Sequence, residues 1–386
     1  MRVKGALGFR PFYLLAALFA VAGILLWLFS YSGSLPAGAY LSGTFWHGHE
    51  MVYGFAIAVM CGFLLTAVRN WTGLPTPTGY SLAALALLWV AARVLVVSGP
   101  ALVAALVDVL FIPALIVAIA VPIFRSRNRR NYKVVLLLAL LAVTHFAYHL
   151  AFLGGLPSWL NHTGVVVAIE LMTILYALVS GRVIPAFTRN AIPGSDPKHA
   201  LWLEVIAFGS LMLITVTTVA SDWMLVPAML PTGLLIVAAV AHLFRLAMWQ
   251  PQVTIPDPLL WMMPVAYSWL PLGLFLRSLA SMSIIGEETW IHALTTGAIA
   301  GLMLAMMMRS TLGHTGRPLA ASGTDISAFL VLQFAAIVRV VAGFANVDLY
   351  RSLVIASGVL WALAFVLFLL RYVPMLTRPR VDGRPG

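Results

Sequence analysis

Charged residues are scarce in this chain. Asp, Glu, Lys and Arg make up 9% of its 386 residues, and apolar residues make up 62%. A soluble domain carries roughly 25% charged residues, because its surface faces water. This composition excludes an ordinary soluble domain and indicates an integral membrane protein.

Cysteine and acidic residues are also rare. The single cysteine, Cys61, lies inside an apolar run, which excludes an internal disulfide, a zinc finger, a CxxC pair and the CxxCH attachment of c-type haem. Only 12 acidic residues oppose 23 Lys and Arg, so the net charge is +11. Cytoplasmic loops of membrane proteins carry such a basic surplus. We therefore expect a lipid bilayer, and not nucleic acid, to be the partner of this charge.

Long apolar runs dominate the chain. Twelve are long enough to span a bilayer, at residues 11–30, 47–68, 80–97, 101–124, 134–153, 162–184, 201–220, 223–249, 259–282, 290–309, 325–345 and 349–374. Pro113 predicts a bend in the fourth. We interpret the first run as an uncleaved helix. No linker is long enough to separate domains, so we predict an all-α integral membrane protein with about 12 transmembrane helices in a single polytopic domain, 1–386.

The distribution of charge predicts the orientation of these helices. With the N-terminus inside, all but four of the 23 Lys and Arg fall on cytoplasmic loops or helix ends, and the exceptions are Arg93, Arg277, Arg339 and Arg351. The reverse orientation would export the basic loop 125–133, which the positive-inside rule disfavours. We therefore expect both termini in the cytoplasm.

Histidines concentrate at one depth in this topology. Six of the nine fall in the outer half of the bundle, namely His47, His49, His145, His149, His162 and His292. The other three, His199, His242 and His314, lie near the inner face. Arg93, Arg277 and Arg339 share the outer half, as do Asp108 and Glu170. Titratable groups are costly within a bilayer, so this concentration indicates a functional site.

Imidazole and guanidinium groups together are typical of a metal or haem site. Imidazole binds iron and copper, and haem needs axial histidines and cations for its propionates. His145 and His149, four residues apart, share one helix face and could bind one ion. His47 and His49 point about 200° apart on a helix, towards different neighbours. Two other interpretations remain open: the histidines serve packing or proton relay, and Arg93 forms a structural pair with Asp108.

Several motifs resemble those of one family of bacterial membrane proteins. They are GFRPF at 8–12, WHGHEM at 46–51, GFLLTA at 62–67, NWTG at 70–73, GRVIP at 181–185, FTRN at 187–190, HAL at 292–294 and RSTLGHTGR at 309–317. Together they resemble the NnrS family over nearly the whole chain, although Arg69 stands where that family commonly has Pro. The resemblance implies a multi-pass protein of the bacterial inner membrane that contains haem b and copper and is linked to nitric oxide and denitrification.

These observations favour a redox protein that binds nitric oxide at a periplasm-side metal site and detoxifies it, as a nitric oxide reductase-type oxidoreductase with an unidentified electron donor. We expect His47, His49 and His292 as haem ligands and His145, His149 and His162 as ligands of copper or a second haem. Arg93, Arg277 and Arg339 would hold propionates, and Glu50 or Tyr53 would donate protons. The alternatives are a non-catalytic haem or copper carrier that protects metal pools during nitric oxide stress and, less favoured, a transporter.

Overall fold

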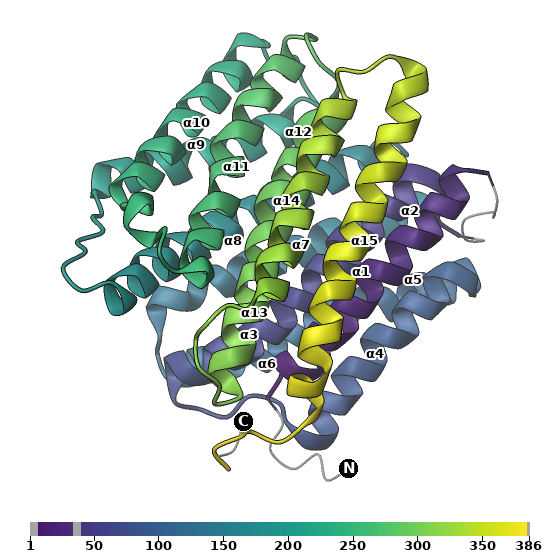
Figure 1. Ribbon diagram of the computed structural model, residues 1–386. Helices are drawn as coiled ribbons and strands as arrows, with labels where there is room; N and C mark the ends of the chain where they lie inside the picture. The colour runs from purple at the N-terminus through teal and green to yellow at the C-terminus, as the bar shows by residue number, and fades with distance from the viewer. Residues whose placement is uncertain (1–6, 34–39, 384–386) are drawn as a thin grey trace. The chain divides into compact units, whose positions relative to one another are not determined.

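A computed structural model describes residues 7–33 and 40–383, and every regular element within them is a helix. The helices form twelve continuous spans that are long and apolar enough to cross a membrane, and some spans join two or three labelled elements (Figure 1). The predicted all-α, twelve-span architecture is confirmed, and the chain is a multi-pass membrane protein. The cytoplasmic location of the termini stays a prediction; Arg2, Lys4 and Arg384, which contribute to it, lie outside the described residues.

The contacts within the chain define two compact units. Unit 1 comprises Met1–Ala168, Ser310–Pro318 and Phe368–Gly386, and unit 2 comprises Ile169–Arg309 and Leu319–Leu367. Helices α8 (Leu160–Ala191), α13 (Gly301–His314) and α15 (Val347–Thr377) contribute residues to both units. The prediction of a single domain over 1–386 stays a prediction.

Unit 1 contains the first five spans. They are α1 (Phe9–Tyr31), the continuous α2 (Gly43–His49), η1 (Glu50–Ala56) and α3 (Ile57–Thr72), α4 (Gly79–Ser98), α5 (Ala101–Val109) with α6 (Phe111–Arg125), and η2 (Arg129–Asn131) with α7 (Tyr132–Phe152). Helix α3 packs on α1 and α6, and α4 packs on α5. A Cβ at Gly62 would lie 3.0 Å from the Tyr13 ring. Close approach of α1 and α3 therefore requires glycine at this position.

The fourth span is interrupted near its predicted bend. Helix α5 ends at Val109 and α6 begins at Phe111, so the single residue Leu110, three residues before Pro113, interrupts the span. Proline has no backbone N–H to donate, and its ring clashes with the carbonyl four residues earlier, here that of Val109. The interruption separates Asp108, at the end of α5, from the regular helix that follows.

Unit 2 contains most of the remaining helices. They are α8 from Ile169 onward, α9 (Leu201–Ala220), α10 (Met229–Met248), η3 (Pro251–Thr254), α11 (Pro258–Ser281), α12 (Glu287–His292), η4 (Ala293–Ala300), most of α13, α14 (Gly323–Ala342) and most of α15. Helix α10 begins six residues later than predicted, because Pro227 disfavours helical backbone at the residue before it. Helix α8 continues through Pro185 to Ala191, beyond its predicted end at 184.

Two spans contain π-helical turns directly after a histidine. Segment η1 begins one residue after His49, and η4 begins one residue after His292. A π-helix has one more residue per hydrogen-bonded turn than an α-helix, and such turns occur mostly at functional sites. Glu50, the first residue of η1, forms a hydrogen bond with its neighbour His49.

Candidate metal centre

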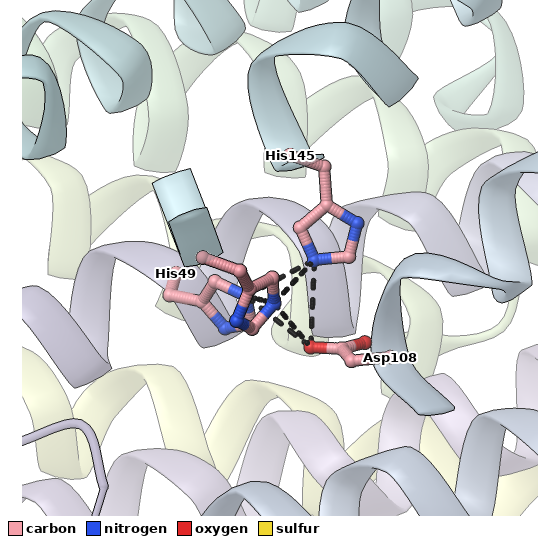
Figure 2. Close-up of side chains that lie close together, drawn as sticks. His49, Asp108 and His145 are labelled. Carbon is pink, nitrogen blue, oxygen red and sulfur yellow. Dashed lines mark hydrogen bonds and ion pairs between the residues drawn. The ribbon is translucent and has the colours of Figure 1, made fainter. Parts of the chain in front are cut away.

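Four buried side chains of unit 1 converge between three helices. His49 lies at the end of α2, Asp108 at the end of α5, and His145 and His149 on one face of α7. All four are at most 2% exposed. Figure 2 shows His145 and His49 directing their rings towards the Asp108 carboxylate. Among the described residues, this is the one group of three or more His, Cys, Asp or Glu whose ligand atoms are close enough to hold a metal ion.

The four ligand atoms form a nearly regular tetrahedron. The Nε2 atoms of the three histidines are separated by 3.1, 3.1 and 3.2 Å. Oδ2 of Asp108 lies 3.3, 3.4 and 3.3 Å from the Nε2 atoms of His49, His145 and His149. The centre of a tetrahedron with these edges lies about 2.0 Å from each corner, which is the bond length of a Zn²⁺ or similar ion to imidazole or carboxylate. The arrangement therefore matches a four-coordinate metal site in size and shape.

Hydrogen bonds outside the cluster orient two of its rings. Nδ1 of His49 lies 2.9 Å from Oε1 of Glu50, and Nδ1 of His149 lies 3.1 Å from the Tyr40 hydroxyl. With Nδ1 as the donor in both contacts, each Nε2 presents a lone pair inward, as in metal-bound histidines generally. Nδ1 of His145 has no hydrogen-bond partner in the described part of the chain. Lone pairs that face one another at 3.1 Å repel, and a cation between them removes that repulsion.

A tyrosine ring stacks on each imidazole. Tyr148 stacks on His49 with 5.2 Å between ring centres. Tyr53 stacks on His145 at 4.2 Å and Tyr40 on His149 at 5.8 Å. Burial, with the Asp108 carboxylate adding to its effect, raises the pKa of Tyr40 to about 12. The Tyr40 phenol is therefore neutral at physiological pH, and the three rings fix the imidazole planes without adding charge.

A buried ion-pair network adjoins His49, Asp108, His145 and His149, which we call the four-residue set. One guanidinium nitrogen of Arg93 donates to Oε1 of Glu50, and the other donates to Oδ1 of Asp108. The pair of Arg93 and Asp108 considered from the sequence is thus confirmed. A Cβ at Gly54 would lie 3.0 Å from Arg93, so glycine leaves the space that the guanidinium occupies. Asp108 is held on both sides, with Oδ1 on Arg93 and Oδ2 facing the histidines.

Three predicted ligands lie outside the four-residue set. His47 packs against the Trp27 ring with 4.4 Å between centres, away from His49 as their spacing predicts. His162 is exposed near the start of α8. His292, in unit 2, lies with Nδ1 2.7 Å from the carbonyl oxygen of Glu288. The grouping expected from sequence therefore differs from the spatial one, which joins His49 to the two histidines of α7.

Two predicted arginines of unit 2 have local partners. Arg277 pairs with Glu170, lies 3.1 Å from the Thr218 hydroxyl and is stacked over the Trp290 ring. Arg339 donates to the Tyr350 hydroxyl over 3.2 Å, and its Nη1 has no hydrogen-bond partner within the described residues. Of these two guanidinium groups, Arg339 retains more capacity for a further anion.

The two predicted proton donors are engaged around the imidazoles. Glu50 is fully buried between His49 and Arg93. The Tyr53 hydroxyl donates to the Thr144 hydroxyl over 3.0 Å while its ring covers His145. Both residues therefore contact metal-ligand candidates and support them.

Sequence reasoning did not select Asp108 as a ligand, nor Tyr40 and Tyr148 as neighbours of the histidines. A carboxylate inside an apolar run, as Asp108 is, was a usable signal, because a bilayer penalises an uncompensated charge. Nothing in the linear pattern indicated the two tyrosines, because tyrosine is common near membrane interfaces.

Unit 2 contains a second buried polar cluster, between the start of α9, the end of α10 and the middle of α11. The Tyr267 hydroxyl lies 2.7 Å from Nδ1 of His242, and Arg245 forms two hydrogen bonds with Glu204. The Arg245 guanidinium is also stacked against aromatic rings, among them that of Trp249 at 5.0 Å. Every charge in this cluster has a partner, which is the pattern of a structural ion pair.

The fold and the four-residue set define a class: a polytopic helical membrane protein with a buried histidine and aspartate centre suited to a metal ion. The chain belongs to the NnrS family, whose model, described as NnrS protein, matches residues 5–380. A search of curated proteins finds no match. Membership of this family suggests a membrane protein linked to nitric oxide.

Proposed function

We propose that this chain is a membrane redox protein that binds copper at His49, Asp108, His145 and His149, contains haem b, and detoxifies nitric oxide. The observation that carries the proposal is the tetrahedron of three Nε2 atoms and one carboxylate oxygen, with edges of 3.1–3.4 Å. Imidazole suits copper, zinc, iron and nickel, and nitric oxide chemistry requires an ion that changes oxidation state. Copper and iron satisfy both conditions, and the resemblance to the NnrS family favours copper.

The chain's own residues hold and orient such an ion. Glu50 and Tyr40 keep Nε2 of His49 and His149 directed inward, and Arg93 fixes the Asp108 carboxylate. The buried rings of Tyr53 and Tyr148, and the half-buried ring of Tyr40, cover the imidazoles. Bound copper would supply nitric oxide binding and one-electron transfer. Reduction of two nitric oxide molecules to N2O and water would consume two electrons and two protons, so catalysis would require an external electron donor.

His292 and Arg339 support the haem part of the proposal. His292 would hold the haem iron, and the contact of its Nδ1 with the Glu288 carbonyl would orient the ring. The unpartnered Nη1 of Arg339 offers a donor for a propionate. We place both centres on the periplasmic side of the bacterial inner membrane, on the basis of the charge distribution of the loops.

Metal analysis and optical spectra of the purified protein test this function. Protein from a haem- and copper-replete host is expected to contain copper, and to show a Soret band and sharp α bands after reduction with dithionite. His149→Ala is expected to lose copper and retain haem, and His292→Ala is expected to lose haem and retain copper. His199→Ala, an exposed histidine outside both sites, is the matched control and should retain both.

Anaerobic addition of nitric oxide separates the alternatives. Formation of N2O favours the reductase, whereas a stable nitrosyl spectrum favours a carrier that protects metal pools. A colourless, metal-free protein from the replete host would contradict both metal functions and leave transport as the better hypothesis.

A further inference from the structure

The charges around the four-residue set do not balance a divalent ion. Among the described residues, the recorded ion pairs join one cation, Arg93, and two anions, Glu50 and Asp108, to the histidines. The histidines that present Nε2 inward are neutral ligands. The set with its network therefore carries one net negative charge before an ion binds.

Arg93 is built into this network and is not a mobile surface cation. Its side chain is 6% exposed, and it bridges carboxylates from two different spans, Glu50 on η1 and Asp108 on α5. The Trp89 ring lies 6.0 Å from its guanidinium carbon, and the Trp89 indole donates to the Gly54 carbonyl over 3.1 Å. Arginine stays charged at all accessible pH, so its charge contributes to the site under every condition.

A divalent ion at the centre would leave one uncompensated positive charge. Burying an unpaired charge in a low-dielectric interior is costly, and such sites recruit a counter-charge. Without Arg93, two carboxylates and a divalent ion would be electrically neutral. The presence of Arg93 thus creates a deficit of one negative charge.

We propose that the loaded centre binds one small monoanion, and that Arg93 is the residue that creates this requirement. The inference deepens the proposed function, on which it rests. The anion would be a fifth ligand beside the four protein atoms, a coordination number that catalytic metal sites reach when a ligand adds. Nitrite and hydroxide are the small monoanions that nitrogen oxides and water supply.

The test is azide binding to purified full-length protein loaded with Cu²⁺, followed by the azide charge-transfer band and the Cu²⁺ EPR spectrum. Wild type is expected to bind one azide. Arg93→Lys retains the charge and is expected to retain azide binding. Arg93→Gln makes the loaded centre neutral and should weaken azide binding at least about tenfold, whereas Glu50→Gln removes a negative charge, raises the net charge of the centre by one and should strengthen azide binding by a similar factor.

Two further arms identify the natural anion. Displacement of azide by nitrite would identify a nitrogen oxyanion as a ligand. A fall in azide affinity with rising pH, without nitrite competition, would identify hydroxide. The Glu50→Gln variant keeps the test decisive if Arg93→Gln fails to fold, because it changes affinity in the opposite direction.

The results distinguish this inference from the proposed function. Wild type that takes up no Cu²⁺ would refute the copper site itself. Wild type that takes up Cu²⁺ and does not bind azide, or variants that bind azide as tightly as wild type regardless of charge, would overturn the anion inference and leave the copper site standing.

Discussion

The Nε2 atom of His49 lies 3.1 Å from the Nε2 atom of His145, although 96 residues separate them in the chain. When neither Nε2 atom carries a proton, the two lone pairs that face each other repel. The packing of α2, α5 and α7 enforces the contact, and a bound cation would convert the repulsion into ligation. Stability and metal binding should therefore be linked at this site.

Metal addition is expected to stabilise wild type and not a ligand variant. At a free metal concentration of 100 times the dissociation constant, linkage predicts about 2.7 kcal/mol of stabilisation. His145→Ala should lose this response, while its chelator-treated form unfolds close to wild type because one repulsive lone pair is gone. Thermal unfolding in detergent, with and without Cu²⁺, measures both effects. An equal metal response in wild type and variant would contradict the site.

Tyr40→Phe is expected to weaken metal binding by roughly 10- to 100-fold, the usual cost of removing a group that orients a ligand histidine. The variant removes the hydroxyl that lies 3.1 Å from Nδ1 of His149 and keeps the stacked ring. Competition with a chelator measures the change. The exposed Tyr80→Phe is the control and should bind as wild type does.

Tyr40 also predicts a pH dependence. Its pKa is raised to about 12 in the folded chain, against an ordinary value near 10. The folded state therefore retains the phenol proton more strongly, and the stabilisation it provides is complete below pH 10 and is lost as pH rises through 12. The tyrosinate absorbance of wild type minus that of Tyr40→Phe should show a transition near pH 12. A difference transition near pH 10 would contradict this burial.

Gly181→Ala is expected to destabilise unit 2 by about 1–3 kcal/mol, the usual cost of overpacking. An added Cβ would lie 2.5 Å from Nη2 of Arg245, which is held by Glu204 and cannot move freely. Gly209→Ala, in helix α9, is the matched control, because its Cβ would meet nothing within 4 Å. Alanine favours helix over glycine, so the control should be neutral or stabilising. Denaturant unfolding in mixed micelles measures both, and equal values would contradict the packing of Arg245.

Glu170→Ala is expected to cost about 3 kcal/mol, the low end for breaking a buried ion pair, because Arg277, whose side chain is 12% exposed, loses its carboxylate partner. Glu170→Ala combined with Arg277→Met should recover part of the loss, since the unpaired charge is then absent. Asp382→Ala, which breaks the surface pair with Arg380, should have little effect on the same unfolding curve. A double variant as unstable as the single one would show that the charge of Arg277 is not the cause.

Sequence reasoning predicted the helical spans because hydrophobic length alone determines them. It also predicted that His145 and His149 share a face and that His47 and His49 diverge, since these are properties of a single helix. It did not predict that His49, Asp108 and the α7 histidines meet. Depth in the membrane places a residue along one axis, and helix order around the bundle, which the linear pattern does not contain, determines the other two.

The sequence by itself determined the class of protein and the number of spans, because a bilayer imposes length and polarity limits on every segment independently. The tertiary structure decided which four side chains form the centre and which neighbours orient them. Glu50 stands at the start of the π-helical segment η1, and Asp108 stands two residues before the interruption at Leu110. Packing between helices then brought these groups, the Arg93 cation and the three tyrosines around one point.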